Sequence, residues 1–197
     1  MIEIRGVVKL NKDPAEYQIL ISGVGGQGVL FITRLLAEAA IEMGLPVFTS
    51  ETHGMAQRGG TVVSHLKVGD FTAPLIAPGQ AGGLIALKPE SVSQHGGYLK
   101  SGAWAVVNSA FPIDGEGPFS LYCCDADGLA RKLENPRAVN LIMLGFVLAG
   151  GRSADTGHAA LFCGLDTIVT VLKRRLRSKD ALLEASIRAL EAGASAI

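Results

Sequence analysis

Cysteine is scarce in this chain of 197 residues, and its few copies are poorly placed for metal binding. There are three, Cys123, Cys124 and Cys163, and no pair has the Cys-x-x-Cys spacing. An odd and sparse set does not build a disulfide framework. Neighbouring residues on a strand point to opposite faces, so Cys123 and Cys124 are badly oriented for one metal ion. The sequence therefore predicts that this chain carries no iron–sulfur cluster by itself.

Charge is also low. Charged residues make up 18% of the chain and hydrophobic residues 48%, whereas about 25% charged is typical. The 18 basic and 18 acidic residues balance, which gives no broad attraction to nucleic acid or to a membrane surface. No apolar run approaches the roughly 20 residues of a membrane span, and residues 1–17 contain no continuous apolar signal core. We expect a cytoplasmic protein whose apolar surface is partly covered by partner subunits.

Short apolar runs alternate with helical patterns along the chain. Gln18–Ser22 predicts a buried strand, Val29–Met43 a helix with one polar stripe, and Pro46–Ser50 a second strand. Together they predict a βαβ unit with parallel strands. Further strands are expected at Thr61–Val68, which can begin a hairpin, and at Leu84–Leu87, Ala103–Asn108 and Ser120–Asp125. Helices are expected at Arg137–Ala149, Asp166–Leu176 and Ser178–Ala192, the last one stopped by Gly193.

A glycine cluster lies directly between the first strand and the first helix. It consists of Gly23, Gly25, Gly26, Gln27 and Gly28 and satisfies Gly-x-Gly-x-x-Gly. Such a turn lets backbone N–H groups approach a phosphate at the helix start. Glycines also serve simply to let a helix and a strand pack closely, and the residues alone leave both interpretations open.

The alternation of strands and helices along the chain predicts an α/β fold. We expect a three-layer, Rossmann-like wound sheet over residues 17–197, mostly parallel with room for a mixed pair, a helical C-terminal third, and an N-terminal extension over residues 1–16.

A second segment, residues 51–60, concentrates polar groups and glycines after the second strand. Its candidate binding residues are Glu51, His53, Gln57, Arg58, Gly59 and Gly60. Ligands of open α/β sheets bind outside the carboxyl ends of the strands, where this segment is expected. Arg58 can pair with a carboxylate or phosphate, or form a salt bridge that shapes the loop. His53 can move a proton or be an ordinary hydrogen-bonded loop histidine.

Together these two segments carry a resemblance. Residues 23–28, the string Glu-Thr-His-Gly-Met-Ala-Gln-Arg-Gly-Gly at 51–60, and the helix beginning Asn-Pro-Arg-Ala-Val-Asn at 135–140 resemble the gamma-type subunits of 2-oxoacid:ferredoxin oxidoreductases. Within that family the similarity is greatest to the indolepyruvate-type beta subunits, and it covers most of residues 17–150. The chain departs from the family pattern at Gly82-Gly83 and at Lys88, where Ala-Asp and an acidic residue are expected. This departure bears on the substrate rather than on the family.

The resemblance implies a role inside a larger enzyme. In such enzymes a partner subunit holds thiamine diphosphate, Mg²⁺ and the iron–sulfur clusters, decarboxylates a 2-oxoacid and passes electrons to ferredoxin, and coenzyme A takes the acyl group. This chain is then expected to bind no cofactor alone, to be inactive alone, and to place residues 23–28 and 51–60 against the catalytic subunit, along one wall of the cofactor or coenzyme A cleft. Arg58 is expected to contact an anionic group there. An aryl pyruvate such as indolepyruvate is the expected substrate.

Two other functions fit the same residues. One is a stand-alone nucleotide-binding oxidoreductase, with Gly23, Gly25 and Gly28 on a pyrophosphate and Glu51 on a ribose. The other is an interaction module in which the glycines serve packing alone. Binding of NAD by the isolated chain would favour the first of these.

Overall fold

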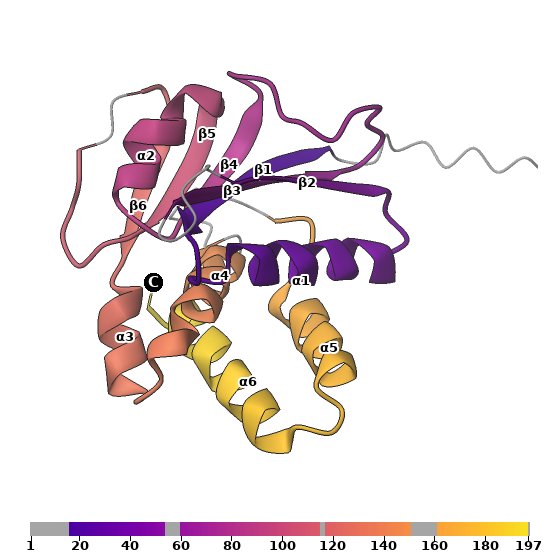
Figure 1. The fold of residues 1–197 in the computed structure, drawn as a ribbon, viewed down its shortest axis with the longest axis vertical. Coiled ribbons are helices and arrows are strands. Elements are labelled where there is room, and N and C mark those ends of the chain that lie inside the picture. The colour runs from indigo at the N-terminus through magenta and orange to yellow at the C-terminus, as the bar shows by residue number, and fades with distance from the viewer. Residues whose placement is uncertain (1–15, 54–59, 115–116, 151–160, 197) are drawn as a thin grey trace, which may run out of the picture.

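The computed structural model describes residues 16–53, 60–114, 117–150 and 161–196. These residues form a six-stranded sheet with helices on both faces (Figure 1). The strands are β1 Tyr17–Val24, β2 Val47–His53, β3 Thr61–Val68, β4 Ala81–Ala86, β5 Leu99–Asn108 and β6 Ser120–Cys124. The helices are α1 Val29–Glu42, α2 Glu90–His95, α3 Ala126–Lys132, α4 Val139–Gly150, α5 Leu165–Arg175 and α6 Asp180–Ala194, with 3₁₀ turns at Gly96–Tyr98 and Pro136–Ala138.

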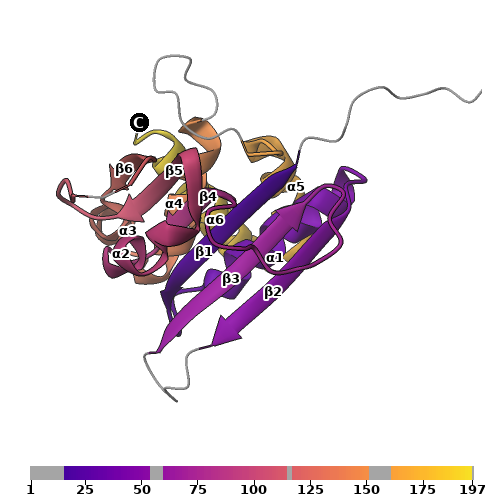
Figure 2. The same cartoon turned by 90° about the horizontal axis from the view of Figure 1, so that it is seen from above.

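The sheet is mostly parallel and mixed at one side, as predicted. Its strand order is β2-β3-β1-β4-β5-β6 (Figure 2). β1, β4, β5 and β6 are joined by parallel pairings, whereas β3 is antiparallel to both β1 and β2. β1 and β2 therefore run in the same direction, as the βαβ pattern predicts, but β3 lies between them. The hairpin that includes Thr61–Val68 is formed with the preceding strand, β2, and not with a following one.

The two faces of the sheet are covered unequally. α1, α3, α4, α5 and α6 lie on one face, and α2 lies on the other (Figure 1). The larger core contains α1 and α4, which contribute Ile32, Leu36 and Ile142 among other fully buried side chains. The smaller core lies under α2 and contains Ile76 from the connection between β3 and β4. The predicted Rossmann-like three-layer arrangement is confirmed, with a thin third layer.

The C-terminal helices depart from the prediction in one respect. Gly193 was expected to end the last helix, yet α6 continues through it to Ala194. A Cβ on Gly193 would lie 2.7 Å from the carbonyl carbon of Ile142, and one on Gly145 would lie 2.8 Å from that of Leu190. The two glycines therefore let α4 and α6 cross backbone against backbone, and Gly193 serves packing rather than helix termination.

No helix in the described ranges is both long and apolar enough to cross a membrane. Residues 1–15, which make up nearly all of the predicted N-terminal extension, lie outside the described residues.

Candidate functional site

The two predicted glycine-rich segments meet at one edge of the sheet. β1 ends at Val24 and β3 begins at Thr61, and these two residues are partners in the antiparallel ladder. The backbone N–H of Gly25 donates to the carbonyl oxygen of Gly60 at 3.2 Å. Residues 23–28 and the end of the 51–60 segment therefore share the carboxyl-end rim of the sheet, as the sequence predicts.

Gln27 holds the glycine turn closed from within. Its Oε1 accepts from the N–H of Val24 at 2.9 Å, and its Nε2 donates to the carbonyl oxygen of Leu87, after β4, at 3.3 Å. The helix after β1 and the helix after β4 lie on opposite faces, so this is the topological switch point at which wound sheets bind nucleotides. In this chain the Gln27 carboxamide lies in that position and bridges the two strands.

The four glycines of the turn have different surroundings. A Cβ on Gly23 would lie 2.8 Å from Oε1 of Gln27, so Gly23 permits the closed turn. Gly28 has φ of 84°, and a Cβ there would lie 3.1 Å from Cγ of Asn140 on α4. By contrast, no heavy atom outside the two neighbouring residues lies within 4 Å of a Cβ built on Gly25 or Gly26. Gly23 and Gly28 therefore serve close packing, while Gly25 and Gly26 present open backbone at the rim.

Asn140 is a buried polar residue in the otherwise apolar helix α4. Its side chain packs against Gly28 of the glycine turn, while its Oδ1 accepts from the N–H of Leu141 at 2.8 Å. The buried Asn140 side chain thus contacts the glycine turn and sets the distance between α4 and the turn.

The remaining predicted site residues lie farther from the turn or outside the described residues. Glu51 lies on β2, exposed, opposite Ser64 of β3. A Rossmann acid follows the strand next to β1, but here β3 separates the two strands. His53 ends β2 and is paired with Val62 in register. Gln57, Arg58 and Gly59 lie outside the described residues.

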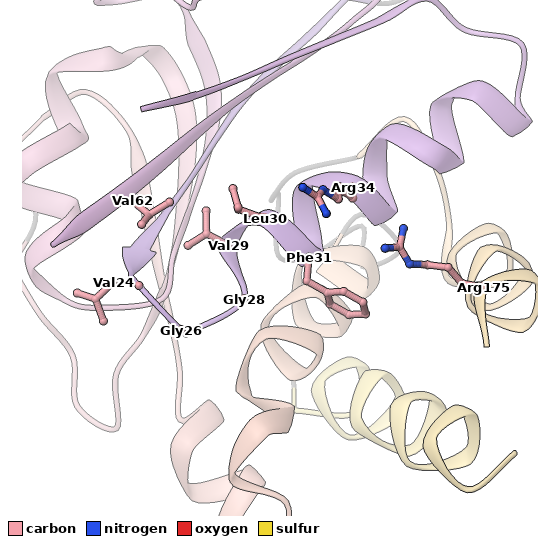
Figure 3. Close-up of a pocket in the computed structure, with 10 residues that line it drawn as sticks. Val24, Gly26, Gly28, Val29, Leu30, Phe31, Arg34, Val62 and Arg175 are labelled. Atoms are coloured by element: carbon pink, nitrogen blue, oxygen red, sulfur yellow. The ribbon is translucent and has the colours of Figure 1, made fainter. Parts of the chain in front are cut away.

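A cleft of about 490 Å³ opens beside the glycine turn (Figure 3). Its wall consists of Gly25, Gly26 and Gly28, of apolar residues from β1, α1 and β3, and of two arginines. The apolar members are Val24, Val29, Leu30, Phe31 and Val62, and the arginines are Arg34 and Arg175. Sequence reasoning missed this cleft, because Arg175 comes from α5 and nothing in its local pattern links it to the turn.

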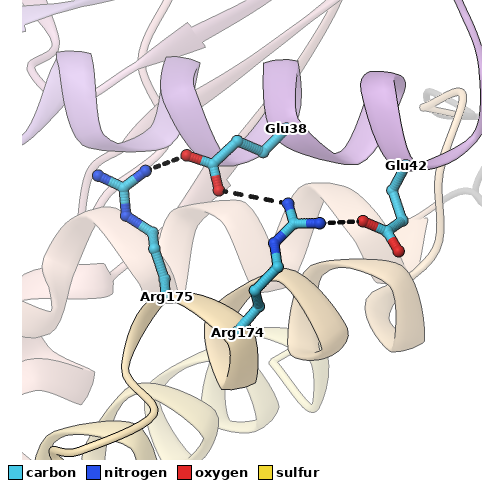
Figure 4. A network of polar contacts seen from close by, with 4 residues as sticks. All are labelled: Glu38, Glu42, Arg174 and Arg175. Atoms are coloured by element: carbon cyan, nitrogen blue, oxygen red, sulfur yellow. Dashed lines mark hydrogen bonds and ion pairs between the residues drawn. The ribbon is translucent and has the colours of Figure 1, made fainter.

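Arg175 is fixed in the cleft wall by a small ionic network (Figure 4). It pairs with Glu38 of α1, and its guanidinium lies 5.8 Å from the ring centroid of Phe31. The neighbouring Arg174 pairs with Glu42 and lies 3.7 Å from Glu38. Two acids and two arginines thus join α1 to α5, and the charges of these four residues cancel. The ion pairs of Glu38 therefore cross from α1 to α5.

Two histidines and two cysteines are buried deeply enough to shift their pKa values. Burial lowers the pKa of His65, as do the nearby His95 and Lys67, and burial lowers the pKa of His95. Burial raises the pKa of Cys124 and of Cys163 to about 12, so neither thiol ionises readily near neutral pH. Within the described ranges, no three His, Cys, Asp or Glu side chains gather in a way that could hold a metal ion.

Comparison with known proteins gives the same family as the residues do. A family model described as pyruvate ferredoxin/flavodoxin oxidoreductase matches residues 18–196. Indolepyruvate oxidoreductase subunit IorB of Archaeoglobus fulgidus is 29% identical over 195 residues, covering 89% of this chain and 92% of that protein.

Two solved structures share the fold. The gamma subunit of keto/oxoacid ferredoxin oxidoreductase from Geobacter sulfurreducens has a TM-score of 0.71 at 23% identity, over 91% of this chain and 96% of that chain. The 2-oxoglutarate:ferredoxin oxidoreductase of Magnetococcus marinus, solved with 2-oxoglutarate, coenzyme A and succinyl-CoA, has a TM-score of 0.75 at 20% identity. The match covers 92% of this chain and 31% of that chain. One fold thus occurs both as a separate subunit and as part of a longer chain.

Proposed function

Because this chain belongs to the pyruvate ferredoxin/flavodoxin oxidoreductase family, we propose that it is the cluster-free subunit of a cytoplasmic 2-oxoacid:ferredoxin oxidoreductase that acts on indolepyruvate or another aryl pyruvate. The observation that supports this most directly is the family match over residues 18–196, together with a relative of nearly equal length named as an indolepyruvate oxidoreductase subunit.

The donor set of the described residues supports an accessory role. They offer no group of three metal-binding side chains, and burial raises the pKa of two of the three cysteine thiols. We therefore assign thiamine diphosphate, Mg²⁺ and the iron–sulfur clusters to a large partner subunit, which decarboxylates the 2-oxoacid. Ferredoxin meets the complex through that partner, and coenzyme A is the co-substrate of the whole enzyme. The contribution of this chain is a preformed rim, with the open backbone of Gly25 and Gly26 at its centre, that meets the catalytic subunit.

The rival role as a nucleotide-binding oxidoreductase has less structural support. Gln27 occupies the switch point between β1 and β4, and β3 separates Glu51 from β1. A dinucleotide would have to displace an internally bonded side chain and would lack the acidic partner that normally binds its ribose.

The test is reconstitution with the thiamine-bearing subunit. We expect the two chains to co-purify, and we expect their complex to reduce ferredoxin when a 2-oxoacid and coenzyme A are supplied, with kcat/KM for indolepyruvate at least tenfold above that for pyruvate or 2-oxoglutarate. Each chain alone is the control and should be inactive. Turnover by this chain alone, or a large rise of its Tm with NAD, would refute the proposal. A preference for another 2-oxoacid would refute only the substrate.

A further inference from the structure

The cleft beside the glycine turn combines apolar walls with excess positive charge. Val24, Leu30, Phe31 and Val62 are only half-buried in the described structure and line the cleft from three different elements. Concave apolar surface left open to water is unfavourable, and it marks a place that another molecule covers. The cleft also borders Gly25 and Gly26, the open backbone of the rim.

Its charge is set by Arg34. The pairs that Arg174 and Arg175 make with Glu38 and Glu42 leave those four residues neutral in sum. Arg34 is exposed and adds one positive charge at the mouth, and the first turn of α1 contains no acidic residue. Figure 3 shows the Arg34 and Arg175 side chains on the same side of the cleft, beyond Phe31. A complementary occupant therefore needs an apolar group for the walls and a single carboxylate for Arg34.

We infer that this cleft is the socket for a segment of the catalytic subunit that carries a bulky apolar side chain next to a carboxylate. The inference rests on the proposed function, since it names the partner of the same rim. A protein segment fits better than a free nucleotide. A phosphate-rich ligand needs several donors or cations, whereas the described lining of the cleft supplies one guanidinium, that of Arg34, with no acidic partner among the described residues. Burial of the apolar side chain supplies affinity. The ion pair aligns the partner segment in the cleft and increases the association rate.

Two substitutions test the socket in the reconstituted complex. Arg34→Glu reverses the charge at the mouth. Gly25→Phe adds a bulky side chain to the cleft wall, at a position where a Cβ would meet no atom within 4 Å outside the two neighbouring residues. The matched control is Lys100→Glu, the same charge change at an exposed position near the opposite end of the sheet, at the start of β5. Subunit Kd is measured by titration at two salt concentrations, after circular dichroism and Tm show that each variant is folded.

We expect Arg34→Glu and Gly25→Phe each to raise the Kd at least tenfold, while Lys100→Glu stays within twofold of wild type. Arg34→Met, which keeps an apolar stem, should raise the Kd less than Arg34→Glu and should weaken its dependence on salt. If Gly25→Phe does not fold, Arg34→Glu and Arg34→Met still decide the question.

The outcomes separate the socket from the function. Wild-type binding with unchanged Kd in both variants overturns the socket and leaves the proposed function intact. Absence of wild-type binding to any thiamine-bearing subunit removes both. If the isolated chain forms dimers and Arg34→Glu dissociates them, the cleft binds a second copy of this chain. A rise of wild-type Tm with coenzyme A alone, absent in Arg34→Glu, would assign it to the co-substrate. Either result overturns the inference.

Discussion

At the scale of single residues, one departure from the expected pattern, Gly83, has a local structural cause. Gly82 and Gly83 are the second and third residues of β4, where the resemblance led us to expect Ala-Asp. Gly83 is paired with Trp104 of β5, and a Cβ on Gly83 would lie 2.7 Å from Cη2 of the indole. The glycine is thus explained by the large ring that covers its strand position. Glycine at position 83 therefore accommodates the packing of Trp104.

This packing predicts opposite outcomes for two adjacent substitutions. Gly83→Ala should lower the free energy of unfolding by about 1–3 kcal/mol, because the indole must move away from the new methyl group. Gly82→Ala is the matched control, since the nearest atom to its Cβ lies 3.7 Å away, and it should change stability by less than about 0.5 kcal/mol. Urea unfolding followed by far-ultraviolet circular dichroism measures both. Equal stability of the two variants would contradict the role assigned to Trp104.

At the scale of helices and strands, the sequence predicted the six strands and the helices α1, α4, α5 and α6 from local signals. Apolar runs located β1 and β4, and the glycine turn followed by a one-sided polar stripe located α1. The strand order could not be predicted in the same way. β3 pairs with both β2 and β1, and no local sequence signal specifies which strands it lies between. The cleft also escaped prediction, because Arg175 and Phe31 are brought together only by the packing of α5 on α1.

The crossing of α4 and α6 yields a prediction that opposes helix propensity. Alanine is favoured over glycine inside a helix by about 1 kcal/mol. Gly145→Ala should nevertheless lower the free energy of unfolding by roughly 1–3 kcal/mol, because its methyl group would press on the backbone of Leu190 and push the helices apart. Gly193→Ala should behave in the same way from the other helix.

Ala185→Gly, on the same helix α6, is the control for this pair. It should also destabilise, by about 1 kcal/mol, through ordinary propensity. Chemical denaturation of the three variants distinguishes the two effects. If Gly145→Ala were more stable than wild type, propensity would outweigh packing, and the close helix crossing would not limit stability.

At the scale of the whole molecule, the two faces of the sheet are covered by different amounts of structure, and we expect them to differ in their resistance to acid. Five helices cover one face, whereas α2 and the connection between β3 and β4 cover the other. That connection is fastened by the N–H of Ile76, which donates to Nδ1 of His65 at 3.2 Å. The bond requires that Nδ1 be unprotonated. The Tyr98 ring lies edge-on to the His65 ring, with the ring centroids 5.9 Å apart, and burial together with the charges of His95 and Lys67 lowers the pKa of His65. Nε2 of His95 is buried without a hydrogen-bond partner among the described residues.

The thin layer should therefore loosen first as pH falls. Burial lowers the pKa of both His65 and His95 below the value of 6.5 expected in the unfolded chain. Below pH 6.5 the unfolded chain binds more protons than the folded one, so the free energy of unfolding decreases with falling pH until the folded-state pKa values are passed. His65→Asn keeps an oxygen acceptor for Ile76 but does not titrate. Urea unfolding at pH 7.5 and at pH 5.5 should show a smaller loss of stability in this variant than in wild type, and a still smaller loss in His65→Asn/His95→Gln. Identical losses in all three proteins would place the acid sensitivity in the carboxylates instead, and the connection between β3 and β4 would then be held by the burial of Ile76 alone.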